Sequence, residues 1–277
     1  MIADRGWVKV TVDYTGVTEV PGNQITREAL SMMCTRYAYA ADLSVGRDVL
    51  EVACAAGQGL GILARKARRV VGADFTSGLL ERAQRHYDGR VPLVQLDAHW
   101  LPFRDQTFDL IILYEAIYYL ADPKGFLAEC RRVLRERGAV LICSVNREWS
   151  DFNPSPFSHR YFSAQELHDL LMSGGFTVET FGAFPVQTKS VGDAVVSMVR
   201  RIAVSLHLIP KTMKGKEWLK RIFLGNLTPM PAEITDGMMD LAKLVPLQPG
   251  APAGSYKVIY AVGRKSAGQN SAPGYHA

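Results

Sequence analysis

Apolar residues follow two different periods along the middle of the chain, and the two periods alternate. Short, mainly apolar runs predict strands, whereas apolar residues three or four positions apart predict amphipathic helices. Strands are expected at residues 49–52, 70–73, 93–96, 108–113, 138–145, 176–184 and 255–262. Helices are expected at residues 24–43, 60–68, 77–87, 123–134 and 164–172. This alternation predicts an α/β fold with a doubly wound, mostly parallel sheet of seven strands.

Two of these elements carry further local signals. The run at 108–113 is apolar at nearly every position, which is typical of a strand that is buried on both faces of a sheet. Ser163 precedes the helix at 164–172 and Glu166 follows three residues later, so we expect a capping box at the start of this helix.

The strand at 49–52 leads into a turn of small residues between Ala53 and Gly59. Small residues let the backbone approach a ligand closely, and the turn directs the N-terminus of the next helix at that ligand. The following strand ends in Asp74, where a carboxylate is well placed to bind both hydroxyls of a ribose. A βαβ unit with a small turn and no ligand would show the same glycines, so the turn alone leaves both interpretations open.

Four segments, in order and with matching spacing, carry a resemblance to a known family. They are residues 49–59, residues 71–74, residues 95–103 with 108–110, and residues 134–142. In these segments the chain resembles the class I S-adenosylmethionine-dependent methyltransferases, in the small-molecule branch called methyltransferase type 11. The resemblance covers residues 35–184 and implies a Rossmann-like fold with S-adenosylmethionine as the cofactor.

The first segment departs from the family pattern, because Ala53 and Ala55 stand where the family usually has glycines. We expect a methyl group to be tolerated at both positions if φ stays negative there. A nicotinamide dehydrogenase is the competing interpretation of this segment. That class requires glycines at the positions of Ala53, Ala55 and Gln58, and it gives no role to residues 97–103. We therefore favour the methyltransferase.

The resemblance implies a role for five residues around the first two strands. Glu51 would meet the ammonium group of the cofactor, directly or through water. Ala53 and Gly57 would contact the methionine portion through their backbone. Asp74 would bind both ribose hydroxyls, and Phe75 would pack on the adenine.

Five more residues receive a role from the same resemblance. Asp97 would accept a hydrogen bond from the adenine amino group, and the Ala98 amide would donate to a ring nitrogen. Tyr114 would line the methionine side near the sulfonium. Arg36 or Tyr37, on the helix at 24–43, would reach the cofactor carboxylate.

Methyl transfer from a sulfonium is an in-line displacement, so the protein chiefly supplies position and exclusion of water. A neutral hydroxyl acceptor would benefit from a general base, whereas an amine or an anion needs little more. Glu115, Tyr118, His159 and Tyr161 are the candidates beside the expected site. The expected function is methyl transfer to a hydroxyl, amine or carbon of a natural product, sugar or lipid-like molecule. A methyltransferase-like protein that binds the cofactor and acts as a non-catalytic partner is the alternative.

Two subclasses of methyltransferase are not favoured. The motif of nucleic-acid amino-methylases should follow the strand at 108–113, where this chain has Tyr114 and Glu115, so no nucleic-acid partner is expected. An acid set of the type that binds magnesium in catechol-methylating enzymes is not evident, and no metal is expected. The four cysteines, Cys34, Cys54, Cys130 and Cys143, have no metal-binding spacing and are expected to be reduced and buried.

The segment 185–254 is an insertion that the common fold does not explain. The net charge of the chain is +5, whereas residues 189–224 alone carry +6. Helices are expected at 191–208 and 216–224. The insertion is interpreted as a substrate lid, as a peripheral membrane contact through 189–224, or as an accessory or dimer contact.

The resulting domain organisation has a cofactor-binding domain made of residues 1–184 and 255–265. The tail at 266–277 is rich in glycine, serine, proline and asparagine and is expected to be disordered. No charged-then-apolar leader and no apolar run of membrane-spanning length is evident, so a cytoplasmic location is expected.

Overall fold

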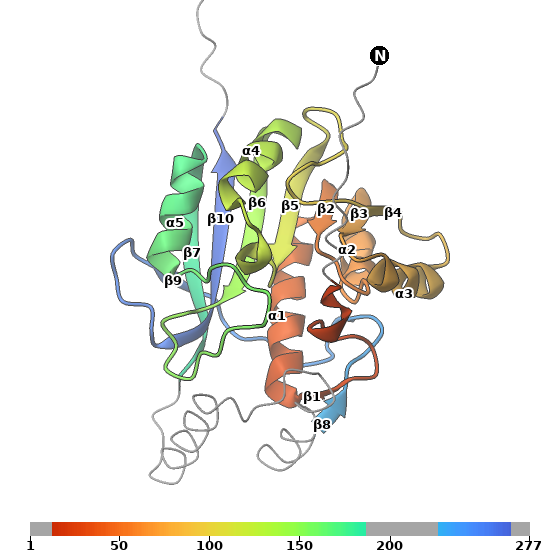
Figure 1. The fold of residues 1–277 in the computed structure, drawn as a ribbon, viewed down its shortest axis with the longest axis horizontal. Coiled ribbons are helices and arrows are strands. Elements are labelled where there is room, and N and C mark those ends of the chain that lie inside the picture. Colours follow the sequence, from red (N-terminus) through yellow and green to blue (C-terminus); the bar gives the residue numbers. More distant parts are fainter. Residues whose placement is uncertain (1–12, 187–226, 267–277) are drawn as a thin grey trace, which may run out of the picture.

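The computed structural model describes residues 13–186 and 227–266. Within them, the main chain forms a central sheet of eight strands. In spatial order these are β4 (Leu93–Gln95), β3 (Arg69–Asp74), β2 (Asp48–Val52), β5 (Phe108–Tyr114), β6 (Leu134–Val145), β10 (Tyr256–Lys265), β7 (Phe176–Pro185) and β9 (Val245–Leu247). The first five are parallel, and β10 runs antiparallel between β6 and β7. The predicted doubly wound, mostly parallel sheet is confirmed (Figure 1).

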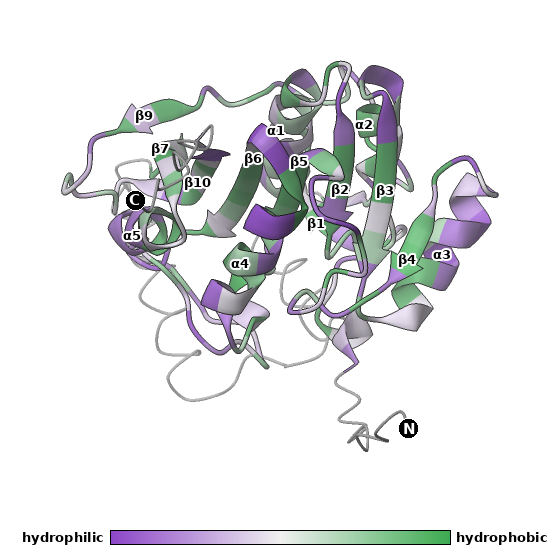
Figure 2. Ribbon diagram, turned by 90° about the horizontal axis from the view of Figure 1, so that it is seen from above, coloured by the Kyte–Doolittle hydropathy of each residue, from purple (hydrophilic) through white to green (hydrophobic). Residues whose placement is uncertain are grey.

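Helices cover both faces of this sheet, so the fold has three layers. The helices are α1 (Arg27–Leu43), α2 (Leu60–Lys66), α3 (Ser77–Tyr87), α4 (Pro123–Val133) and α5 (Ala164–Ser173). Residues of α1, α2 and α3 pack against one face of the strands, and residues of α4 and α5 pack against the other. Figure 2 shows α1 and α2 on one side of the strands and α4 on the opposite side.

Alternate residues of β2 belong to the two faces, as the pleat of a strand requires. Val49 packs with the α1 side and Leu50 with the α4 side, and both are fully buried. The order of the strands reverses at β2, because β3 and β4 lie on one side of it and β5 and β6 on the other. In open α/β sheets, ligands bind at the carboxyl ends of the strands at such a point.

The structure differs from the prediction of the hydrophobic pattern in the start of one helix and in an additional strand, among other ends of elements. The helix expected from Gln24 begins at Arg27, because Gln24–Thr26 form the short strand β1, which pairs with β8 (Leu227–Pro229). Thr26 is then the N-cap and accepts a hydrogen bond from the backbone N–H of Ala29 (3.0 Å). The eighth strand, β9, was not expected, since it has three residues with a proline in the middle and lies at the edge of the sheet.

Part of the insertion packs closely on the rest of the domain. Residues 227–254 contain the strands β8 and β9 and no helix. Met230 and Ile234 are buried, and the backbone N–H of Ile234 donates to the carbonyl of Gln58 (2.7 Å). Both helices expected in the insertion lie in 187–226, outside the described residues, as does the tail at 267–277.

Candidate cofactor and acceptor pocket

The turn after β2 has an unusual backbone. The φ angle is 59° at Ala53, 53° at Ala55 and 79° at Gly57. The expectation that φ stays negative at the two alanines is therefore wrong. A residue with a Cβ pays about 1–2 kcal/mol in this left-handed region. Strain of this kind persists where surrounding contacts fix the backbone, and it is common at functional sites.

Asp74, at the carboxyl end of β3, is one of the residues that fix this turn. Its Oδ2 accepts a hydrogen bond from the backbone N–H of Ala55, and its Oδ1 accepts one from that of Thr76, both at 2.8 Å. Burial raises the pKa of the Asp74 carboxyl, and the backbone N–H groups oppose that shift. Since an ionised carboxylate has about four lone-pair sites, Asp74 can still accept hydrogen bonds from a ribose.

Tyr37 of α1 reaches across the start of α2 to the end of β2. Its hydroxyl donates to Oε1 of Glu51 at 2.6 Å. Its ring lies directly over Gly59, where an added Cβ would be 1.8 Å from a ring carbon. Gly59 is therefore required for this contact, whereas its φ is an ordinary −95°.

Glu51 is the most deeply buried carboxylate of the site, with 1% of the residue exposed. Its Oε2 has no hydrogen-bond partner among the described residues. Burial raises the pKa of Glu51 to about 7, although the Tyr37 hydroxyl and the Arg36 guanidinium act in the opposite direction. A cationic group that reaches Oε2 would stabilise the ionised form.

A pocket of about 820 Å³ opens at the carboxyl ends of β2, β3 and β5. It brings together eleven of the residues named from the sequence: Arg36, Tyr37, Ala53, Asp74, Phe75, Asp97, Ala98, Tyr114, Glu115, Tyr118 and His159. Glu51 and Gly57 do not line it. Glu51 lies behind Tyr37, and Gly57 faces Tyr87, whose hydroxyl donates to the Gly57 carbonyl at 2.7 Å.

One end of the pocket has the groups expected for an adenosine. Phe75 is 43% exposed, so its ring is available for stacking. Asp97 Oδ1 accepts hydrogen bonds from the backbone N–H (2.9 Å) and from Nδ1 (2.6 Å) of His99. Because His99 Nε2 accepts from the backbone N–H of Asp122 (3.2 Å), Nδ1 is assigned as the protonated ring nitrogen.

The other end is built around Glu115, which follows β5 and has a φ of 51°. Its carboxylate pairs with the guanidinium of Arg36 (3.3 Å) and accepts from the Tyr118 hydroxyl and the backbone N–H of Val145, both at 3.2 Å. Burial raises the pKa of Glu115, and Arg36 acts against that shift. Nε of Arg36 is buried without a partner in this part of the chain.

The other candidates at this end differ in how they are placed. Tyr118 stacks on Tyr161 with ring centroids 4.2 Å apart, but Tyr161 does not line the pocket. His159 is exposed at the rim, and its backbone N–H donates to the Tyr118 carbonyl at 2.7 Å. The Tyr114 hydroxyl donates to the Arg36 carbonyl at 2.7 Å, so it joins α1 to β5.

Part of the pocket wall could not be predicted from the sequence. Tyr14, in a short 3₁₀ helix (Tyr14–Gly16), lies against Tyr119 with ring centroids 5.1 Å apart and against Phe75 at 6.4 Å. Met32 and Met33 of α1 also line the pocket. The N-terminal residues show no periodic pattern, and the methionines follow the ordinary helical spacing of a core-facing side.

Residues 13–186 and 227–266 contain neither a metal site nor a membrane-spanning helix. No group of three or more histidine, cysteine, aspartate or glutamate residues there is arranged to hold a metal ion. The four cysteines are buried and unpaired with one another, as expected. None of the described helices has the length and apolar character that a membrane crossing requires.

Comparison with known proteins gives the site a context. A family model described as a methyltransferase domain matches residues 50–142, which hold the turn, Asp74, Asp97 and Glu115. Residues 50–142 of this chain are therefore similar to a methyltransferase domain. A probable S-adenosylmethionine-dependent methyltransferase of Mycolicibacterium smegmatis is 37% identical to it over 146 residues, which are 50% of this chain and 56% of the relative.

Two further similarities extend over more of the methyltransferase domain. A demethylmenaquinone methyltransferase of Thermotoga maritima is 29% identical over 187 residues, or 65% of this chain and 77% of that protein. The solved structure of the YcgJ protein from Bacillus subtilis matches with a TM-score of 0.54 and 16% identity, over 88% of this chain and 100% of that chain, and it supports the fold. The chain spans about half the length of the first curated relatives it matches.

S-adenosylmethionine is the cofactor that a methyltransferase domain of this class implies, and the residues present fit it. The unpartnered, buried Oε2 of Glu51 suits a cationic ammonium group. Asp74 and the exposed Phe75 ring suit a ribose and an adenine, respectively. The turn at 53–57 has little side-chain volume, so it leaves room for the methionine portion.

Proposed function

We propose that this protein transfers the methyl group of S-adenosylmethionine to a hydroxyl, amine or carbon of a small, lipid-like acceptor. One observation carries the proposal. The 820 Å³ pocket is lined at one end by Asp74 and Asp97 and at the other by Glu115 and Tyr118. A cofactor and an acceptor would therefore share one cavity, with the reacting atoms between them.

The two ends of the pocket have different tasks in this proposal. The cofactor, when bound, supplies an electrophilic methyl carbon. Glu51, Asp74 and the turn after β2 hold it, while Tyr37 and Tyr114 limit the access of water from the α1 side. Positioning of this kind is the main contribution that a protein makes to an in-line displacement.

Glu115 is our candidate for the general base when the acceptor is a hydroxyl. Its side chain is partly buried and its pKa is raised, so it can accept a proton more readily than an exposed glutamate. Arg36 keeps it ionised and fixed in place. Tyr118, whose hydroxyl bonds to the same carboxylate, would orient the acceptor or pass the proton on. His159, at the rim, has no such partner in the described residues.

The apolar side chains of the pocket favour a lipid-like or aromatic acceptor. Tyr14, Met32, Met33 and Tyr119 line it as well. Methionine adapts its shape to bulky apolar groups, and tyrosine stacks on flat ones. The relative from Thermotoga maritima is named for a quinone acceptor, which supports this choice of class.

The test has two stages. Calorimetry with S-adenosylhomocysteine should show one site per chain, and a panel of demethylated quinones, phenolic lipids and sugars should then be incubated with radiolabelled S-adenosylmethionine. Glu115→Gln should keep the affinity for S-adenosylhomocysteine within a few-fold but lower transfer to a hydroxyl acceptor. Binding of the cofactor without transfer to any acceptor class would favour the alternative, a non-catalytic partner.

The role of the insertion also belongs to this proposal. The lid and the peripheral membrane contact expected from the sequence both rest on residues outside the described ones, and either would bear on the choice of a lipid-like acceptor. Residues 227–254 should stay in any deletion, because Met230 and Ile234 are core residues. Replacement of 187–226 alone by a glycine–serine linker should preserve cofactor binding and abolish transfer.

A further inference from the structure

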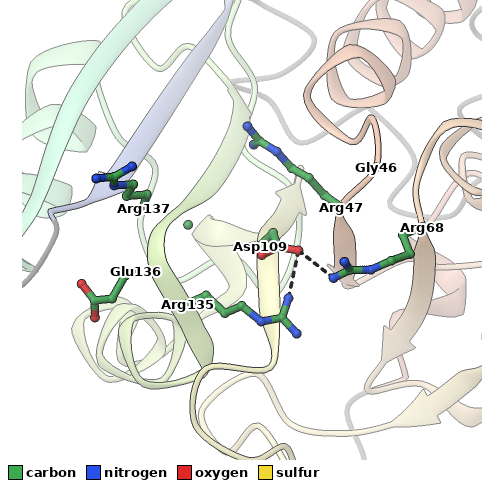
Figure 3. A pocket seen from close by; sticks show the side chains of 8 residues that line it. Gly46, Arg47, Arg68, Asp109, Arg135, Glu136 and Arg137 are labelled. Carbon is green, nitrogen blue, oxygen red and sulfur yellow. Dashed lines mark hydrogen bonds and ion pairs between the residues drawn. The ribbon is translucent and has the colours of Figure 1, made fainter.

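A second pocket lies at the opposite edge of the sheet from the cofactor site. It has a volume of about 470 Å³ and is formed where β2, β3, β5 and β6 begin, whereas the cofactor pocket lies where β2, β3 and β5 end. Its lining residues are Gly46, Arg47, Arg68, Asp109, Arg135, Glu136, Arg137 and Gly138 (Figure 3). The proposed methyl transfer uses none of them.

Arginine is the most frequent residue in this pocket, and acidic residues neutralise only part of the positive charge of the arginines. Asp109, at its centre, pairs with Arg68 (3.4 Å) and Arg135 (2.9 Å), as Figure 3 shows. The neighbouring Asp48 also pairs with Arg68 (2.7 Å) and Arg135 (2.9 Å). These contacts lower the pKa of Asp48 to about 2, the largest cause being the hydrogen bond from Arg68. Asp48 is therefore ionised at any ordinary pH, and both aspartates are already engaged by arginines.

Two arginines of the pocket are left without an acidic partner in the described part of the chain. In Figure 3 the Arg47 side chain extends away from Asp109, and Arg137 lies on the opposite side of Asp109 from Arg68. The remaining acid, Glu136, pairs with Lys265 at 3.3 Å. The backbone of Arg47 is fixed, because its carbonyl accepts hydrogen bonds from the N–H groups of Arg68 (2.9 Å) and Arg69 (3.3 Å).

The backbone at Arg137 gives an independent indication. β6 pairs with β5 at Leu134 and again at Ala139, so residues 135–138 bulge out of the ladder. Arg137 has a φ of 63° within this bulge, where glycine would avoid the strain. Because glycine would remove this strain, we expect the side chain of Arg137 to have a function.

We propose that this pocket binds the phosphate group of a ligand. Arg47, whose backbone is fixed, would bind the phosphate oxygens. Arg68 and Arg135 would supply the surrounding positive potential, and the side chain of Arg137 would turn toward the phosphate. Guanidinium groups suit phosphate because their planar donors match its oxygens in pairs. The phosphate would come either from a free phosphorylated small molecule or from the headgroup of an anionic lipid.

The first test is calorimetry of pyrophosphate binding to the full chain. It is done at about 0.15 M salt, because the attraction of exposed charges is screened at that ionic strength. Saturable binding to one site is expected. Arg47→Ala should weaken it about tenfold, which corresponds to the loss of about one charge-assisted hydrogen bond. Arg85→Ala removes the same charge from the last turn of α3, far along the chain from this pocket, and should have no effect. S-adenosylhomocysteine binding should be unchanged in both variants, which separates this inference from the proposed function.

Arg137→Gly makes the test specific. It should raise Tm, because the strain is relieved, and it should weaken pyrophosphate binding about threefold or more, because one charge is lost. A structural role of Arg137 would instead lower Tm and leave the affinity unchanged. No saturable binding at millimolar pyrophosphate, or equal losses in Arg47→Ala and Arg85→Ala, would overturn the proposal.

Vesicles distinguish the two sources of phosphate. Sedimentation with phosphatidic acid vesicles that is lost in Arg47→Ala would assign the pocket to a lipid headgroup. Binding of pyrophosphate with sedimentation unaffected by Arg47→Ala would assign it to a free ligand, and any lipid contact would then belong elsewhere, such as the basic segment 189–224.

Discussion

Protonation of Glu51 is expected to weaken the binding of S-adenosylhomocysteine below pH 7. The Glu51 carboxylate is buried, holds the Tyr37 hydroxyl on one oxygen and has its other oxygen unpartnered, and its pKa is raised to about 7. In the proposed site, the ammonium group of the ligand would bind the ionised form. In the free protein that form is the minor one in mildly acidic solution, so binding there requires the release of a proton.

The size of the effect follows from the pKa. At pH 6 about one-tenth of Glu51 is ionised, so the apparent affinity should be about tenfold, or about 1.4 kcal/mol, lower than at pH 8. Stability of the free protein changes in the same window. The folded pKa is about 7 and the reference value is 4.5, so folding favours the protonated carboxyl. Stability is therefore greatest below about pH 4.5 and decreases up to about pH 7, by on the order of 3 kcal/mol for this group alone.

Calorimetry at several pH values between about 5.5 and 8.5 would measure the effect, because this range extends about one unit or more on each side of the pKa. Two buffers of different ionisation enthalpy at each pH would count the protons that are released on binding. Glu51→Gln is the matched control, since it keeps the shape and removes the titration. It should bind about tenfold or more weakly at pH 8 and show a flat profile.

The same profile in wild type and Glu51→Gln would refute the reasoning, because another group would then be titrating. Asp74 is the nearest alternative, since its pKa is also raised and its charge acts on Glu51. A wild-type profile that is flat from pH 6 to pH 8 would show that Glu51 is already ionised in the free protein.

Four further results are expected. Asp74→Ala should weaken S-adenosylhomocysteine binding by about 1.5–3 kcal/mol, as calorimetry would show; unchanged affinity would remove Asp74 from the site. Ala53→Gly should raise Tm by a few degrees, because glycine relieves the positive φ, whereas the matched change Ala56→Gly, where φ is not positive, should lower it; equal shifts would contradict the strain argument. Gly59→Ala should displace the Tyr37 ring and weaken both stability and cofactor binding, which thermal melts and calorimetry would detect; a wild-type Tm would mean that the ring moves at no cost. Methyl transfer to an identified acceptor should persist in EDTA, and loss that magnesium restores would reveal a metal-dependent subclass.

The hydrophobic pattern determined the order and type of nearly every element of the sheet. The nearly continuous apolar run at 108–113 lies in β5, with Leu110–Leu113 fully buried, and the capping box of Ser163 and Glu166 is present at the start of α5. These features are local: a strand period, a cap and a turn each depend on neighbours within a few residues. The acidic residues at the strand ends could be named for the same reason, because the position of a strand fixes where its end lies.

Contacts between distant segments decided the rest. The positive φ of Ala53 and Ala55 could not be read from their identity, since alanine usually avoids it; Asp74, nineteen residues after Ala55, holds that backbone in place. The pairing of Arg36 with Glu115 joins a helix to the end of a strand and turns two separate candidates into one partly buried ion pair.

The second pocket shows the same limit of sequence reasoning. Arg47, Asp109 and Arg137 come from three separate segments, and only the parallel alignment of β2, β5 and β6 brings them to one edge. The net charge of the chain gave no sign of this cluster, because the charge of +6 at 189–224 accounts for all of the excess. A sequence records how many charges a segment carries, whereas the fold alone sets the distances over which charges attract or repel one another.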